Sequence, residues 1–160
     1  MKEPGLVLLV EDNKNDIVLI TRAFARAGIM TPIRAVGTGE EAMAYLRNEG
    51  PYAERAKNPT PSLILLDLGL PGIDGFELLK WIRSQRELRA IRVVVLTGRV
   101  HLHDVRRAYE LGANSFLTKP LEILKIDALI RAVDCPGFWI EGPVYEFGCG
   151  CGNEMRRGGL

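Results

Sequence analysis

The stretch Leu63-Ile64-Leu65-Leu66-Asp67-Leu68-Gly69-Leu70-Pro71-Gly72 decides how the rest of the chain is interpreted. An uninterrupted apolar run ends in one carboxylate, and a turn rich in Gly and Pro follows at once. Such a short run, bounded by turn residues, is typical of a strand buried on both faces of a parallel sheet. We therefore expect Asp67 at the carboxyl end of a strand, where open α/β sheets bind their ligands. Taken alone, Asp67 is explained as well by a helix cap or a turn.

The apolar pattern elsewhere predicts a sheet in which strands alternate with helices. Further strands are expected over 6–10, 33–36, 92–96 and 114–118, a helix follows each strand, and the last helix lies near 122–133. The first, third and fourth strands are apolar throughout and belong in the middle, whereas the second and fifth carry polar residues and suit the edges. With right-handed crossovers, this predicts an α/β fold with a doubly wound, five-stranded parallel sheet in the order 2-1-3-4-5 and helices on both faces.

Length and composition indicate one domain. The chain has 160 residues, 47% of them hydrophobic, and a formal net charge of +1, so no overall field attracts it to nucleic acid or to an anionic membrane. Residues 1–134 are predicted to form the domain, and 135–160 a Gly-rich C-terminal tail without a separate output domain. No apolar run approaches the roughly 18 residues that span a bilayer, and no signal peptide is evident, so a cytoplasmic protein is expected. The three cysteines lie late in the chain and form no recognisable metal or disulfide pattern.

The carboxyl ends of the predicted strands carry complementary polar groups. Glu11 and Asp12 follow the first strand, Asp67 ends the third, Thr97 follows the fourth and Lys119 follows the fifth. Each has a structural explanation of its own: the first two as helix caps, Thr97 as a hydroxyl bonded to backbone, and Lys119 as one half of an ion pair. Together, however, the three carboxylates would repel one another. Each pair at about 4 Å costs about 4 kcal/mol at an effective dielectric of 20, so the cluster needs a proton or a cation.

Carboxylate ligands of this kind suit Mg²⁺, which binds through one or two carboxylates and a phosphoryl group. A hydroxyl and an ammonium suit phosphoryl oxygens. The sequence therefore predicts phosphoryl transfer onto Asp67.

Four separated motifs carry a resemblance to a known family. Leu8-Leu9-Val10-Glu11-Asp12, Leu65-Leu66-Asp67-Leu68 with Pro71-Gly72-Ile73-Asp74-Gly75, Val94-Val95-Leu96-Thr97-Gly98 and Lys119-Pro120 resemble the receiver domain of two-component response regulators. The similarity covers about residues 6–133 and implies a flavodoxin-like fold. It implies a phosphorylation-dependent switch, not a turnover enzyme, in which Asp67 accepts a phosphoryl group from a sensor histidine kinase.

The resemblance also implies roles for individual residues. Glu11, Asp12, Asp67 and the backbone carbonyl of Gly69 would hold Mg²⁺; Thr97 and Lys119 would contact the phosphoryl group; Thr97 and Phe116 would form the switch; and Pro120 would follow a cis peptide bond. Gly69 departs from the family, which often has a side chain such as Asn at that position. The long polar connection over 48–61 and the aromatic pair Phe138-Trp139 are similar to stand-alone regulators that partner bacterial phytochromes. A bacteriophytochrome kinase as partner and a homodimer are therefore expected, without direct nucleic-acid or membrane contact.

Other classes of protein are considered. A phosphatase of the haloacid dehalogenase type also uses an aspartate after an apolar strand, but it needs a second aspartate where this chain has Gly69. A nucleotide-binding Rossmann module would need glycines after the first strand, where Glu11 and Asp12 would repel phosphate. A receiver fold that serves only as an unphosphorylated scaffold or binding module remains open.

Overall fold

The computed structural model describes residues 5–99, 101–121, 126 and 129, and within them it has alternating strands and helices. The elements are β1 (Val7–Val10), α1 (Lys14–Arg26), β2 (Ile33–Val36), α2 (Gly39–Arg47), the 3₁₀ helix η1 (Gly50–Tyr52), β3 (Leu63–Asp67), α3 (Gly75–Ser84), the 3₁₀ helix η2 (Arg86–Leu88), β4 (Arg92–Thr97), α4 (Leu102–Glu110) and β5 (Ser115–Thr118). Ile126 and Leu129 are helical, as predicted for the last helix; the rest of 122–133 and the tail lie outside the described residues.

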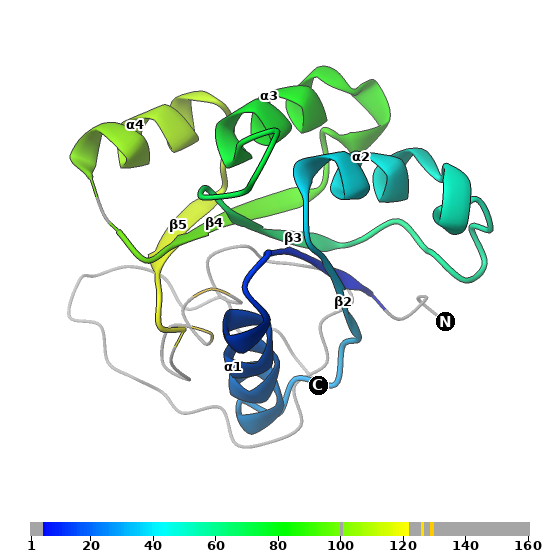
Figure 1. Ribbon diagram of the computed structural model, residues 1–160, viewed down its shortest axis with the longest axis horizontal. Helices are drawn as coiled ribbons and strands as arrows, with labels where there is room; N and C mark the ends of the chain where they lie inside the picture. The colour runs from blue at the N-terminus through cyan, green and yellow to red at the C-terminus, as the bar shows by residue number, and fades with distance from the viewer. Residues whose placement is uncertain (1–4, 100, 122–125, 127–128, 130–160) are drawn as a thin grey trace, which may run out of the picture.

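The strands form one five-stranded parallel sheet in the order β2-β1-β3-β4-β5, as predicted from their composition (Figure 1). The central strands β1 and β3 are buried along their whole length, whereas every residue of the edge strand β5 is partly exposed. The apolar runs therefore occupy the middle of the sheet because they are covered on both faces.

Alternate residues of the strands divide between two apolar cores. Leu8, Leu66 and Val95 face the core covered by α2, α3 and α4, which lie together above the sheet in Figure 1. Leu9 and Leu65 face the opposite core, which α1 covers and to which Ile126 and Leu129 also belong. The predicted placement of helices on both faces is confirmed.

Side chains that the chain places before its helices decide where these helices begin. Asn13 accepts hydrogen bonds from the Asn15 and Asp16 amides at the start of α1, Thr38 accepts one from the Glu41 amide, and Asp74 accepts one from the Glu77 amide. Since Asn13 and Asp74 cap α1 and α3, the carboxylates of Glu11, Asp12 and Asp67 are not needed for capping.

Most of the connection over 48–61 is exposed, and two tyrosines fasten it to the domain. The Tyr45 hydroxyl donates to the Pro59 carbonyl at 2.9 Å, and the Tyr52 hydroxyl donates to the Glu41 carboxylate at 2.6 Å. The two rings meet edge to face, with centroids 5.1 Å apart. Burial and the Glu41 carboxylate raise the pKa of Tyr52 to about 12, so this hydroxyl stays protonated at neutral pH.

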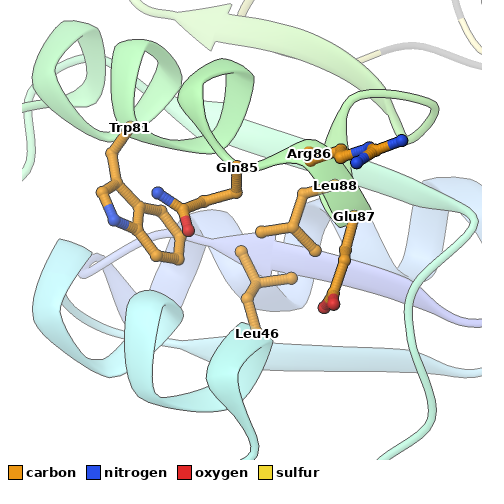
Figure 2. A pocket seen from close by; sticks show the side chains of 6 residues that line it. All are labelled: Leu46, Trp81, Gln85, Arg86, Glu87 and Leu88. Atoms are coloured by element: carbon orange, nitrogen blue, oxygen red, sulfur yellow. The ribbon is translucent and has the colours of Figure 1, made fainter.

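A cavity of about 300 Å³ opens between the carboxyl ends of α2 and α3 (Figure 2). Leu46 of α2 points toward Leu88 and Gln85, and the Trp81 ring closes one side. The guanidinium of Arg47 lies 4.9 Å from the centroid of that ring. Because the helices run antiparallel to the strands, this cavity lies at the amino-terminal edge of the sheet, away from the polar strand ends. No helix among the described residues is both long and apolar enough to cross a bilayer.

Candidate functional site

The sheet register brings the predicted polar residues to one edge. Glu11 follows β1 directly, Asp67 and Thr97 are the last residues of β3 and β4, and Lys119 follows β5. Val10 pairs with Leu66, and Asp67 with Leu96, so that these strands end at nearly the same height. The polar groups meet because β1, β3, β4 and β5 end at the same edge of the sheet.

Three carboxylates form a compact cluster at this edge. Oxygen atoms of Glu11, Asp12 and Asp67 all lie within 4.8 Å of one another. Glu11 is 1% exposed and Asp67 is 9% exposed, whereas Asp12 is exposed to solvent. Oxygen ligands at this separation, with one side open to water, fit a hard divalent cation that keeps part of its hydration shell.

Lys119 supplies the positive charge of the cluster. Its ammonium group donates a very short hydrogen bond to Glu11, lies 3.0 Å from the Asp16 carboxylate and 3.5 Å from the Asp67 carboxylate. The Lys119 side chain is only 15% exposed. A buried ammonium with these partners cannot leave the site without stranding carboxylates.

Burial and pairing shift two pKa values in the site. Burial raises the pKa of the Glu11 carboxyl above its usual value, while the bond from Lys119 and the Asn13 amide oppose this shift. Burial alone would lower the pKa of Lys119, but its hydrogen bonds to Glu11 and Asp16 and the nearby Asp67 charge raise it. The ammonium is therefore charged across the physiological range.

The Thr97 side chain lies at the same edge of the sheet but makes no hydrogen bond to this cluster in the described part of the chain. The Thr97 hydroxyl accepts a bond from the Arg99 amide at 3.3 Å, which is the local backbone contact considered from the sequence. The Thr97 carbonyl in turn accepts the Lys119 amide at 2.8 Å. Phe116 is half-buried and packs against the core under α3 and α4.

The loop after β3 is held from both ends. The Gly69 amide donates to the Asp67 carboxylate at 3.2 Å, and the Ile73 amide donates to Glu40 of α2 at 3.2 Å. Gly72 has a φ of 73°, a conformation that favours glycine. The peptide bond between Lys119 and Pro120 is cis, as predicted.

The family assignment rests on the match between this sequence and known receivers. Residues 7–131 match the family described as "Response regulator receiver domain". The chain belongs to this family.

Relatives of the receiver regulate different processes. This chain is 44% identical over 132 residues to the probable methanogenesis regulatory protein FilR2 of Methanothrix harundinacea. The match covers 82% of this chain and 83% of FilR2. The chain is 40% identical to the phosphorylated cyanobacterial phytochrome response regulator RcpA, with a TM-score of 0.69 over 82% of this chain and 91% of RcpA. The bacteriophytochrome response regulator AtBRR is 35% identical, with a TM-score of 0.75 over 91% of this chain and 100% of AtBRR.

The family identifies the receiver as a component of two-component signalling and leaves the other readings without support. The glycine at position 69 offers no second carboxylate for a haloacid dehalogenase, and Glu11 and Asp12 are not a phosphate-binding glycine loop. The predicted resemblance and the predicted fold are both confirmed.

Asp16 is the polar residue of the receiver's site that the sequence analysis missed. It lies in the first turn of α1 and approaches Lys119 although 103 positions separate them. One signal could have indicated it: Asp16 precedes the buried Ile20 by one helical turn, so the two share a face that points toward the sheet. Nothing in the sequence identifies Lys119 as the residue above that face.

Proposed function

We propose that Asp67 is the phosphoacceptor of this receiver and that its phosphorylation changes the affinity of the protein for its partners. The observation that carries this proposal is the position of Asp67 between a carboxylate pair suited to a cation and the ammonium of Lys119, 3.5 Å from its oxygen. A carboxylate nucleophile beside two sources of positive charge is what transfer of an anionic phosphoryl group requires. The protein is thus a switch that is modified once per signal, not a turnover enzyme.

In the proposed step an Asp67 oxygen attacks the phosphorus of a phosphohistidine on the sensor kinase. The bond from phosphorus to the histidine nitrogen breaks, the nitrogen keeps the electron pair, and Asp67 becomes an acyl phosphate. Lys119 would neutralise the added charge with its ammonium group. Thr97 would exchange its bond from the Arg99 amide for one to a phosphoryl oxygen.

The donor set also fits Mg²⁺, because it offers carboxylate oxygens of Glu11, Asp12 and Asp67 within 4.8 Å of one another. The carbonyl of Gly69 would complete the protein ligands. When bound, the ion would offset the charge of the carboxylates and of the transferred group. The shortage of positive charge among the described residues of the cluster supports this role.

The switch would pass from Thr97 to Phe116. Thr97 lies on β4 and Phe116 on the neighbouring strand β5, and Phe116 packs toward the core under α3 and α4. A shift of Thr97 toward the phosphoryl group would open space for this ring and change the surface formed by α4 and β5. That surface, or the tail over 135–160, would then carry the contact to a partner.

The partners we propose are a sensor histidine kinase and a second copy of the receiver. The phytochrome regulators among its structural relatives favour a bacteriophytochrome as the kinase, whereas FilR2 points to a different regulatory process. On α4, Leu102 is 68% exposed and Tyr109 is 48% exposed, which suits a contact between copies. We propose output through protein contacts, without direct binding to nucleic acid.

The test is intact-mass analysis after incubation with acetyl phosphate, with and without Mg²⁺, on the wild type and Asp67→Asn. We expect one phosphoryl increment that requires both the ion and Asp67. Absence of any increment in folded protein, with a cognate kinase as well as with acetyl phosphate, would favour the unphosphorylated scaffold instead. An increment that persists in Asp67→Asn would move the acceptor to another residue.

A further inference from the structure

We infer that Asp16 is a positioning residue that competes with the phosphoryl group for the Lys119 ammonium and thereby slows phosphorylation of Asp67. This inference rests on the proposed role of Asp67 as phosphoacceptor. It deepens that role by assigning a function to a carboxylate outside the predicted site.

The geometry places Asp16 nearer to the ammonium than the acceptor itself. The Asp16 oxygen lies 3.0 Å from the Lys119 nitrogen, whereas the nearest Asp67 oxygen lies at 3.5 Å. The side chain of Asp16 is 31% exposed, while that of Asp67 is 12% exposed. Lys119 therefore lies between a buried pair of carboxylates, Glu11 and Asp67, and an outer one, Asp16.

The structure of α1 fixes Asp16 in this place. The Asp16 amide donates to the capping side chain of Asn13 at 3.2 Å, and the helix continues into the buried residue Ile20 one turn later. The carboxylate is thus held by a helix turn with a capped start. A cavity of about 310 Å³ adjoins it, and Asp16, Lys119 and Gly98 are among the residues that line this cavity. The open space leaves room for the ammonium to move between its partners.

A bond to Asp16 weakens what Lys119 can offer to a phosphoryl group. An ammonium whose charge is already shared with an outer carboxylate attracts the incoming anion less, and it must give up or lengthen that bond to face the phosphorus. Glu11 and Asp12 have a cation as an alternative partner under the proposed function, whereas Asp16 lies outside the cluster suited to a metal. Asp16 is thus the competitor that a bound cation would not remove.

The experiment measures the rate constant of phosphorylation by acetyl phosphate at saturating Mg²⁺ in the full-length protein. We expect Asp16→Asn to be phosphorylated about three- to tenfold faster than the wild type, the range that a partly exposed charge interaction allows. Asp16→Glu keeps the carboxylate and should return the rate toward that of the wild type. Thermal unfolding checks that each variant is folded.

Two controls separate competition for Lys119 from a general effect of charge. Glu77→Gln removes an exposed carboxylate from the first turn of α3, at the same edge of the sheet, and should leave the rate within twofold of the wild type. In a Lys119→Met background, Asp16→Asn should give no acceleration, because the group through which Asp16 acts is gone.

Each outcome decides the inference. Equal or slower phosphorylation of Asp16→Asn, equal acceleration by Glu77→Gln, or acceleration that persists without Lys119 would overturn it. Failure of the wild type itself to accept a phosphoryl group on Asp67 would instead overturn the proposed function, so the two failures are distinguishable.

Discussion

At the scale of single residues, the charge balance of the site sets its stability as well as its chemistry. Lys119 is paired with Glu11, Asp16 and Asp67, and an Asp12 oxygen lies within 4.8 Å of oxygens of Glu11 and Asp67. Carboxylates gathered in this way repel one another, and the two buried ones, Glu11 and Asp67, carry the cost of desolvation as well. The carboxylates that would serve phosphorylation therefore lower the stability of the fold.

Glu11→Gln is expected to stabilise the receiver in the absence of divalent ions. The amide keeps the shape of the side chain, and its single oxygen can still accept the hydrogen bond from Lys119, while its NH2 group cannot accept the one from the Asn13 amide. The substitution removes a carboxylate whose pKa burial has raised. We expect a gain of about 1 kcal/mol in the free energy of unfolding at pH 7, measured by urea denaturation with a chelator present.

The pH dependence of that gain has a definite sign. A carboxyl with a raised pKa binds its proton more tightly in the folded state, so the wild type loses stability as pH rises from 4.5 through the folded pKa. The advantage of Glu11→Gln should therefore be largest at neutral pH and shrink as pH falls toward 4.5. An advantage that grows on acidification would contradict the assigned shift.

Titration of Mg²⁺ provides an independent check on the proposed ligands. A cation that binds only the folded state stabilises it by mass action. We expect the melting temperature of the wild type to rise with millimolar Mg²⁺, and that of Glu11→Gln and Asp12→Asn to rise less. Equal shifts in all three proteins would remove Glu11 and Asp12 from the ligand set.

At the scale of secondary-structure elements, close approach of backbones positions Asp67. A Cβ atom added at Gly75, the first residue of α3, would lie 2.6 Å from the Asp67 carbonyl oxygen and 2.7 Å from the Leu68 Cα. Helix α3 thus begins directly against the end of β3, with no space for a side chain.

Gly75→Ala is expected to destabilise the receiver by about 1–3 kcal/mol, because backbone must shift to admit the methyl group. The same shift would displace Asp67 and slow its phosphorylation. Gly69→Ala is the matched control: its added Cβ would lie 3.9 Å from the Asp67 carboxylate oxygens, an ordinary contact. Urea denaturation of both variants measures the difference, and equal stabilities would contradict the crowding at Gly75.

One arginine fastens α3 to the next two connections of the chain. The Arg83 guanidinium donates to the Gly112 carbonyl at 2.9 Å, to the Ile91 carbonyl at 2.8 Å and to the Asn114 side chain at 2.9 Å. Burial, with a smaller contribution from the charge of Arg92, lowers the pKa of Arg83. The helix, the start of β4 and the turn before β5 thus share one cationic donor.

Arg83→Met should lower the free energy of unfolding by about 2–3 kcal/mol, because it leaves partly buried acceptors without a donor while keeping most of the aliphatic packing. Arg86→Met, an exposed arginine of η2, should change it by less than about 0.5 kcal/mol. Urea denaturation of the two variants side by side gives the comparison. Similar losses in both would show that the bonds of Arg83 contribute little.

How much the sequence could predict depends on the range of the interaction. The strand order followed from which runs are apolar throughout, and the shared edge followed from parallel strands, so the meeting of Glu11, Asp67 and Lys119 was predictable. The bonds of Arg83 and the Asp16–Lys119 pair were not, since they join residues far apart in the chain through the exact rotation of helices on the sheet. Periodicity indicates the face of a helix but not its partner there.

At the scale of the whole molecule, the proposed signal is a change in association. Phosphorylation would alter the surface of α4 and β5, where Leu102 and Tyr109 are exposed. We expect the phosphorylated receiver to sediment with a larger fraction of dimer than the unmodified protein, and Asp67→Asn to show no change after the same treatment. A single boundary at monomer mass in every sample would refute the homodimer.

The residues after Lys119 limit how short a stable version of this protein can be. On one face of the sheet α2, α3 and α4 complete the core. On the other face, within the part of the chain that the structure describes, α1 does so together with Leu121, Ile126 and Leu129, of which Ile126 is 0% and Leu129 1% exposed. A fragment that stops after Lys119 would retain every polar residue of the site described here and yet leave one side of β3 and β4 exposed to solvent. The minimal stable unit therefore extends to Leu129 or beyond, at least ten residues past Lys119.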